Sequence, residues 1–304
     1  MISQAVIQQI RQRNTLKSGK MKKLKKPPAW LFPHTPERKY TAQMFSLCLE
    51  IRRLVNEILI PEIPSLMREA TYTYPQNDPN SRLDDFIDEL NETIEKIRFF
   101  LGPKEQETKE TASQVGIEIA IFNQKQYEKT VNSVLGVDVF LQEPWLVSQM
   151  ELFANQNAEL ITSLVDTELK RVSGVVQRGL QEGTSYKDME NEIKKTFGIT
   201  RRHARLIARD QTTKLNGSLT KLRQQELGIS QYRWQTSGDE RVRPSHRALS
   251  EKICRWDDPS VYLDEKSGKW KKKSSIGASE THPSQDVNCR CVPIPVLEGI
   301  FDGL

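Results

Sequence analysis

The sequence predicts an α+β protein, with a predominantly α-helical body and a small irregular C-terminal α+β domain. Two observations lead to this fold class. Apolar residues recur every three or four positions over much of residues 40–227, which is the period of an amphipathic helix. After Gly228 the pattern changes to a short alternating segment and then to turn-rich stretches. With 304 residues the chain is long enough for two or three domains.

Residues 1–38 are predicted to form a basic, proline-rich arm. Residues 1–26 contain eight basic residues and no acidic one, whereas the rest of the chain has 37 basic and 40 acidic residues. The net charge of +5 therefore originates in the arm, which favours an anionic partner such as DNA or an acidic protein surface. The basic residues are Arg11, Arg13, Lys17, Lys20, Lys22, Lys23, Lys25 and Lys26.

Two aromatic residues, Trp30 and Phe32, follow the lysine run and lie among four prolines between residues 27 and 36. The prolines exclude a continuous helix in this part of the arm. Two interpretations are open. The aromatic residues dock on a partner, or they fold back onto the body of the chain.

A helical domain is expected at residues 39–142. Pro61 and Pro64 should interrupt the chain after the first helix, and Gly102-Pro103 should end the second. A capping box at Ser81 begins that second helix, and residues 104–111 are predicted to be a charged loop. The three expected helices span residues 40–60, 82–101 and 112–135.

A second helical region, residues 143–228, is expected to lead into the C-terminal module. Its helices are predicted at residues 146–182, 186–196 and 200–227, with a stop at Gly183 and a cap at Ser185. Arg201, Arg205 and Arg209 recur every four residues on one face of the last helix. That face is either simply solvated or contacts DNA phosphates or an acidic partner.

Residues 229–304 are predicted to form the small α+β domain. Its first segment alternates so that Tyr232 and Trp234 share a face, which indicates a strand. The lysine-rich stretch 266–273 is expected to be an inserted loop. No apolar run is long enough for a signal peptide or a membrane span of about 18 residues, so we expect a soluble protein made in a reducing cytoplasm.

The histidine and cysteine residues of this domain can supply a tetrahedral zinc site. Its candidate ligands are His246, Cys254, Cys289 and Cys291, and His282 is a second candidate imidazole. Cys289 and Cys291 can reach one metal because residues i and i+2 of an extended chain share a face. Alternatively, the thiols are core residues, or Cys254 forms a disulfide. Cys48 falls on the apolar face of its helix and is predicted to be a core residue.

Three groups of residues occur in order over about 90 residues. The first is Ile207-Ala208-Arg209-Asp210-Gln211-Thr212, followed by Asn216. The second begins with Trp234 and continues with Asp239, Arg241, Arg243, His246 and Leu249, and the third is Val287-Asn288-Cys289-Arg290-Cys291-Val292-Pro293. This ordered set resembles the domain of phage Mu F-like minor head proteins, also called phage head morphogenesis proteins. In that family the helix usually reads Thr-Glu where this chain has Asp210-Gln211.

The resemblance implies a minor head protein of a tailed bacteriophage, located in the capsid interior near the portal vertex and in the host cytoplasm during assembly. The implied partners are the portal protein, capsid or scaffold proteins and packaged double-stranded DNA. The implied role is procapsid assembly and DNA packaging or delivery. Asp210, Trp234, Asp239, Arg241, Arg243, His246 and Asn288 are then structural residues, with no catalytic residue among them.

Two other hypotheses come from the residues themselves. Asp239, Arg241, Arg243 and His246 could serve a nuclease that acts on phage or host DNA, with His246 as general acid or base. Cys289 with His246 and Asp239 could form a thiol protease site. A cellular nucleic-acid-binding module is a further alternative, since it would also need the basic arm.

Overall fold

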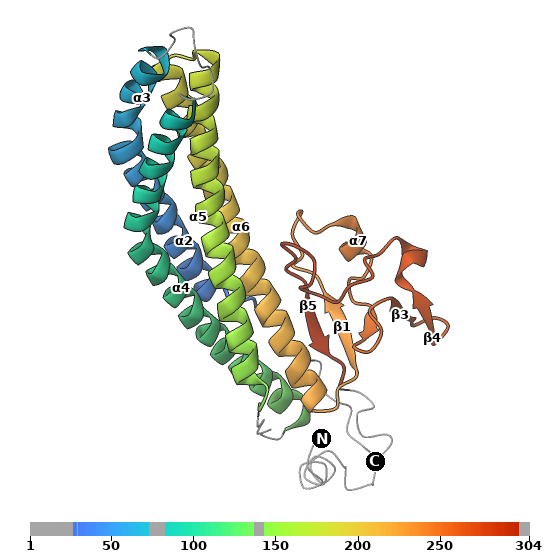
Figure 1. Ribbon diagram of the computed structural model, residues 1–304. Coiled ribbons are helices and arrows are strands. Elements are labelled where there is room, and N and C mark those ends of the chain that lie inside the picture. Colours follow the sequence, from blue (N-terminus) through green and yellow to red (C-terminus); the bar gives the residue numbers. More distant parts are fainter. Residues whose placement is uncertain (1–26, 29, 73–82, 137–142, 298–304) are drawn as a thin grey trace, which may run out of the picture. The chain divides into compact units, whose positions relative to one another are not determined.

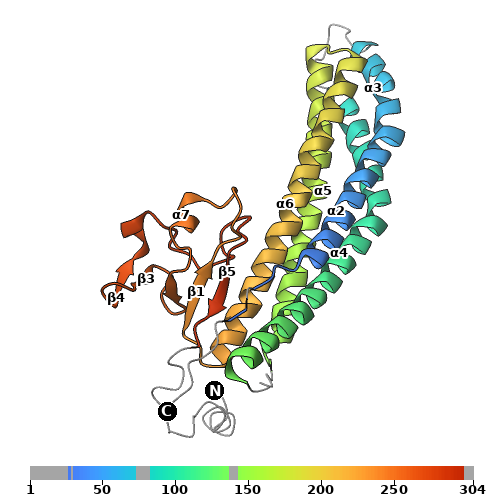
Figure 2. The same ribbon diagram turned by 180° about the vertical axis from the view of Figure 1, so that it is seen from behind.

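The fold is that of an α+β protein with a helical body and a small C-terminal antiparallel sheet, as predicted (Figures 1 and 2). The computed structural model describes residues 27–28, 30–72, 83–136 and 143–297. The eight basic residues of the arm and the capping residue Ser81 lie outside this range. The chain forms two compact units, one from residues 37–115 and 151–209, the other from residues 1–36, 116–150 and 210–304. Each unit is described separately.

The first unit is a bundle in which helices α2 to α6 run side by side (Figures 1 and 2). Its core contains Met44, Leu47, Ile51, Leu164 and Val172, all at most 1% exposed. Cys48 is also buried, which confirms its assignment as a core residue. The helices are α2 (His34–Leu54), the π-helical turn η1 (Val55–Leu59), α3 (Ile60–Tyr72), α4 (Leu83–Leu135), α5 (Leu146–Glu182) and α6 (Tyr186–Glu226), of which α4 to α6 continue into the second unit.

The interruption predicted at Pro61 and Pro64 is wrong. Both prolines lie within α3, directly after the π-helical turn Val55–Leu59. A proline in a helix normally clashes with the carbonyl one turn earlier. In the π-helical turn before Pro61, the backbone N–H of Ile60 bonds to the carbonyl of Val55, five residues earlier, so the hydrogen-bond pattern already departs from that of an α-helix. The buried side chains of Leu59, Ile63 and Leu66 hold α3 against the bundle through the prolines.

The predicted stop at Gly102-Pro103 and the loop at 104–111 are also wrong, because α4 is continuous from Leu83 to Leu135. Leu101, Thr108 and Ala112 are fully buried at helical spacing. The intervening charges therefore form the solvated face of a helix, where Lys109 pairs with Glu105 at 2.6 Å, one turn away. In a sequence, a run of charged residues that lacks an apolar residue at every helical turn has the same pattern as a loop.

Helix α5 has the predicted bounds, and Gly183 ends it with a left-handed φ of 67°. The predicted cap is confirmed, since Ser185 Oγ accepts the backbone N–H of Asp188 at 3.2 Å. The break predicted near Gly198 is wrong, because α6 runs unbroken from Tyr186 to Glu226. Buried Thr196 and Thr200 accompany Gly198 on that turn and keep the helix packed.

The second unit contains a five-stranded antiparallel sheet in the order β4-β3-β2-β1-β5. Tyr232 and Trp234 are both fully buried on β1, as the alternation predicted. The stretch 266–273 is not a simple loop. It contains β4, which forms a hairpin with β3 and pairs Leu263 with Trp270. The elements are β1 (Gln231–Gln235), α7 (Pro244–Arg247), β2 (Ile253–Arg255), β3 (Val261–Asp264), β4 (Lys269–Lys272), the 3-10 turn η2 (Lys273–Ile276) and β5 (Val292–Pro295).

Two buried clusters stabilise this unit. The first joins the C-terminal end of α4 to β5 and contains Trp30, Tyr127, Val131, Ile229 and Val292. The second lies on the sheet around Tyr232, Trp234, Trp256, Cys289 and Cys291. No helix in the described part of the chain is both long enough and apolar enough to cross a lipid bilayer.

A buried polar network connects α4, α6 and the segment before α5. The guanidinium of Arg223 is fully buried and donates two hydrogen bonds to the carboxylate of Glu143, at 2.6 and 3.0 Å. It also donates to Asn123, whose amide donates to Asn216 Oδ1 at 2.9 Å. Every charge in this network has an opposite charge or a hydrogen-bond partner, which buried charges require. Asn216 of the sequence motif is thus a structural residue.

Candidate metal centre and the loop that builds it

The loop from Asp286 to Cys291 is where the three motif groups meet. Asp210 on α6 accepts the backbone N–H of Asn288 at 2.7 Å, and Arg243 donates to the carbonyl of Val287 at 2.8 Å. Asp239 forms an ion pair with Arg290 and a weaker one with Arg241. Residues far apart in the sequence thereby fix one short loop.

The backbone of this loop needs residues that accept unusual conformations. Asn288 has a φ of 59°, in the left-handed region that asparagine tolerates better than most residues. Ser284, before the loop, has a φ of 72°, and its hydroxyl donates to the carbonyl of Cys291 at 2.8 Å. The chain reverses direction between Ser284 and Asn288, so the side chains of Cys289 and Cys291 both lie in the interior of the second unit.

His246 enters that interior from the short helix α7. Pro244 is at the start of α7, where a proline is tolerated because that N–H would be unpaired in any case. The His246 ring contacts the Trp234 ring edge-on, with centroids 5.6 Å apart. Its Nε2 is 2.7 Å from Asp286 Oδ2, and this carboxylate oxygen also accepts the Ser279 hydroxyl at 3.0 Å. These contacts fix the rotation of the imidazole.

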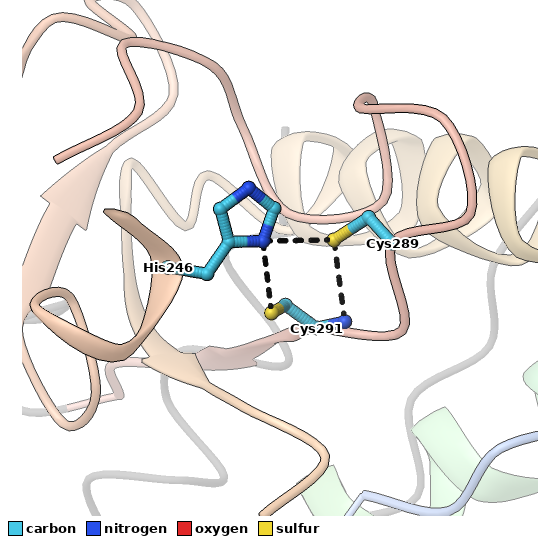
Figure 3. A group of neighbouring side chains, drawn as sticks. All are labelled: His246, Cys289 and Cys291. Carbon is cyan, nitrogen blue, oxygen red and sulfur yellow. Dashed lines mark hydrogen bonds between the residues drawn. The ribbon is translucent and has the colours of Figure 1, made fainter. Parts of the chain in front are cut away.

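The other ring nitrogen of His246 faces both thiols (Figure 3). Nδ1 lies 3.5 Å from Cys289 Sγ and 3.6 Å from Cys291 Sγ. The backbone N–H of Cys291 also points at Cys289 Sγ, at 3.4 Å. The three side chains are between 2% and 4% exposed. The result is a buried triad of one imidazole and two sulfurs.

The two thiols have opposite shifts in acidity. The hydrogen bond with Cys291, and then that with His246, lowers the pKa of Cys289 to about 5, although burial opposes this. The proximity of Cys289 and then burial raise the pKa of Cys291. Cys289 also raises the pKa of His246, with a smaller contribution from Asp286. One negative charge is thus stabilised between the sulfurs, and thiolate is the form that binds metals.

Cys254 does not join this triad, so the structure brings together three of the four predicted ligands. Cys254 is on β2 opposite Tyr232, and burial raises its pKa. His282 does not join it either, since its Nδ1 is 2.9 Å from the hydroxyl of Tyr232. Strand pairing places Cys254 beside Tyr232, and the hydroxyl of Tyr232 contacts His282, so both residues lie beside Tyr232, two residues before Trp234 on β1. The four described cysteines are all free thiols.

The three arginines predicted to contact DNA or a partner lie on α6. Arg201 and Arg205 are exposed on α6, and their guanidinium groups lie over the ring of Phe45, at 4.5 and 5.2 Å from its centroid. Arg209 forms an ion pair with Glu37 at 3.0 Å. The basic face is therefore partly engaged within the bundle, and contact with DNA stays a prediction.

The two aromatic residues of the arm, Trp30 and Phe32, differ in how deeply they are buried. Trp30 is 4% exposed and packs against Tyr127, so it lies in the core of its own unit. Phe32 is only partly buried and contacts the ring of His34. The structure therefore supports the interpretation in which Trp30 folds back onto the chain, rather than docking on a partner.

Neither predicted catalytic set is assembled. His246 is buried with both ring nitrogens engaged, whereas a nuclease base must reach a phosphodiester. Asp239, predicted as the third member of a thiol protease set, is bound to Arg290 instead of His246. The carboxylate beside His246 is Asp286, which sequence reasoning missed. Only its place three residues before Cys289 could have suggested this role.

The fold and the site define an antiparallel α+β domain preceded by a long helix, with a histidine and two cysteines at its centre. Residues 170–294 match the family described as Phage Mu protein F like protein, which is the family that the ordered motifs resemble.

Two curated proteins are similar to the chain. An uncharacterized protein of Haemophilus influenzae is 32% identical over 179 residues, which cover 58% of this chain and 36% of that protein. A minor head protein of Bacillus phage SPP1 is 25% identical over 162 residues, covering 51% of this chain and 46% of that protein. The chain thus spans less than half the length of each relative. No solved structure matches it.

Proposed function

We propose that this chain is a minor head protein of a tailed bacteriophage and acts in head morphogenesis. The observation that carries the proposal is the Mu F-like segment at residues 170–294, together with the similarity to a protein named as a minor head protein. The motif residues support a structural role, because Asp210 and Arg243 hold one loop together and the His246 imidazole is buried.

The finer proposal is that the protein lies inside the capsid near the portal vertex and contacts the portal protein, capsid or scaffold proteins and packaged DNA. Its role is to assist procapsid assembly and the packaging or delivery of DNA. The basic arm supports this, since eight positive charges without an acid are attracted to DNA or to an acidic portal surface. Arg201 and Arg205 supply further exposed positive charge on α6.

A gene disruption in the phage or prophage that encodes the chain tests the proposal. Loss of the protein should lower the yield of infectious, DNA-filled particles, and wild-type protein supplied in trans should restore it. Electron microscopy of the purified heads and plaque titre measure the two quantities. If the disruption changed none of head morphology, DNA content and titre, the proposed role in head morphogenesis would be refuted.

The nuclease alternative has its own test, a plasmid-nicking assay. Wild-type protein and the His246→Ala variant should both leave supercoiled plasmid intact over a range of divalent metals. Cleavage by the wild type that disappears in the variant would contradict a purely structural role.

A further inference from the structure

The His246 triad places one ring nitrogen against two sulfurs. An imidazole nitrogen forms one directed hydrogen bond, either by accepting with its lone pair or by donating its N–H. Yet Cys289 Sγ and Cys291 Sγ lie at nearly the same distance from Nδ1, 3.5 and 3.6 Å. The geometry therefore does not single out one sulfur as the partner of this nitrogen. A single ion bound by all three atoms would satisfy them together.

The distances agree with such an ion. Zinc binds a thiolate at about 2.3 Å and an imidazole nitrogen at about 2.0 Å, and tetrahedral angles then separate nitrogen and sulfur by roughly 3.5–3.6 Å. The measured separations from Nδ1 match this value, and the three ligand atoms all lie within 4.8 Å of one another. Figure 3 shows one imidazole nitrogen facing both sulfurs.

The surroundings of His246 have the form that metal sites require. A metal-binding histidine usually donates its other ring N–H to a carboxylate, which fixes the ring and makes it a better ligand. Asp286 occupies that position at 2.7 Å and is itself held by Ser279. With Nε2–H donated to Asp286, the lone pair of Nδ1 points at the sulfurs. The backbone N–H of Cys291 supports a thiolate at Cys289.

We propose that His246, Cys289 and Cys291 bind a zinc ion that stabilises the fold of the C-terminal domain. Two thiolates with one imidazole favour zinc over hard cations such as magnesium or calcium. The described residues supply three protein ligands, and Cys254 is not among them, so a water molecule completes the tetrahedron. The site lies where strands β1 and β5, helix α7 and the loop 286–291 meet, so the ion links segments that are far apart in the sequence.

Metal analysis of the purified full chain tests the proposal, with a matched cysteine control. Wild type, grown with zinc and freed of loosely bound metal, should retain about one zinc per chain. Cys289→Ser and Cys291→Ser should each lower retention more than tenfold. Cys254→Ser removes a buried thiol of the same hydrophobic cluster and should retain the wild-type amount. A metal-free wild type, or equal loss in all three variants, would refute the site.

A second measurement separates metal loss from misfolding. Cobalt(II) bound to the wild type should give the visible bands of a tetrahedral ion and a near-ultraviolet thiolate band, and X-ray absorption of the zinc form should show two sulfur neighbours. Removing the ion with a chelator should lower the unfolding temperature reported by tryptophan fluorescence, and zinc should restore it. Unchanged unfolding after complete removal, or a Cys289–Cys291 disulfide in place of a metal, would contradict the proposal.

Discussion

At the scale of single residues, the carboxylate of Asp210 joins the first motif group, on α6, to the third, in the loop before β5. Asp210 is 8% exposed, and its two oxygens have different partners. Oδ1 accepts the backbone N–H of Asn288 at 2.7 Å, and Oδ2 forms an ion pair with Lys214 at 2.7 Å. The first bond is partly buried and fixes a residue with a left-handed backbone, whereas the second involves a lysine side chain that is 41% exposed. Their contributions to stability should therefore differ.

We expect Asp210→Ala to lower the unfolding free energy by about 1–3 kcal/mol, because it leaves the Asn288 amide without its acceptor. The matched variant Lys214→Ala removes only the partly exposed ion pair and should cost at most about 1 kcal/mol. Urea unfolding followed by tryptophan fluorescence measures both, since all five tryptophans lie in the second unit. Equal costs would show that the ion pair, not the loop contact, gives Asp210 its importance.

His282 should make the second unit sensitive to acid. Burial, and then the charges of Lys221 and Lys273, lower the pKa of His282 to about 4. The unfolded chain protonates this residue below about pH 6.5, whereas the folded chain stays neutral until about pH 4. The unfolded state therefore binds more protons between these values, and stability falls as the pH is lowered through this window.

The expected loss between pH 7 and pH 5 is about 2 kcal/mol from this residue alone. His282→Asn should lack that component, so its stability should change less with pH, even if it is less stable overall. His203→Asn, at an exposed position on α6, should keep the wild-type pH dependence. A His282 variant with the full acid sensitivity would mean that other groups control it.

At the scale of secondary-structure elements, α6 approaches the site loop most closely at Gly217. A Cβ added there would lie 2.4 Å from the Cβ of Ser284 and 2.8 Å from its hydroxyl. Ser284 cannot easily yield, because its backbone is left-handed and its hydroxyl is bonded to Cys291. Gly198, in the same helix, has no neighbouring atom nearer than 3.9 Å.

These two glycines make a matched pair. Gly217→Ala should destabilise the protein by about 1–3 kcal/mol through overpacking. Gly198→Ala should instead stabilise it by up to about 1 kcal/mol, because alanine favours a helix over glycine. Thermal unfolding monitored by circular dichroism compares them. A stabilising Gly217→Ala would show that the loop moves aside freely.

The elements show which features a sequence can reveal. Helix α5 was predictable because its apolar spacing is unbroken and Gly183 marks its end. Helix α4 was not predictable as one continuous helix, because residues 104–111 are mostly charged. In this part of the helix the buried face consists of Leu101, Thr108 and Ala112. Local breakers such as Gly102-Pro103 lower helix propensity, but tertiary packing of the flanking turns outweighs that cost.

The site was predictable in part for a similar reason. Cys289 and Cys291 are two residues apart, so their shared direction follows from local geometry, and the ordered motif identified His246. Cys254 was misplaced because its position depends on which strand it pairs with, and β2 places it opposite Tyr232. Asp286 was missed because nothing local distinguishes it from other loop carboxylates. Long-range pairing is not encoded in spacing alone.

At the scale of the whole molecule, charge is divided between the basic arm and a weakly acidic remainder. If the arm binds DNA, its affinity should fall steeply with salt, because each neutralised phosphate releases counterions. The log–log slope on duplex DNA should approach about −7 when all eight charges make contact.

Deletion of residues 1–26 should abolish this binding and leave the unfolding temperature unchanged. Replacing Lys22, Lys23, Lys25 and Lys26 with glutamine should roughly halve the slope. Fluorescence anisotropy with labelled duplex DNA at several salt concentrations measures it. Undiminished binding by the deleted protein would move the contact to another surface, such as that around Arg201 and Arg205.

The head-protein assignment is tested most directly by the protein composition of purified particles. Procapsids and mature virions of the encoding phage, separated on gradients and analysed by quantitative mass spectrometry, should contain this chain at far fewer copies than the coat protein. The chain should co-sediment with heads and stay protected from added protease. Its absence from every particle, despite expression during infection, would contradict the assignment.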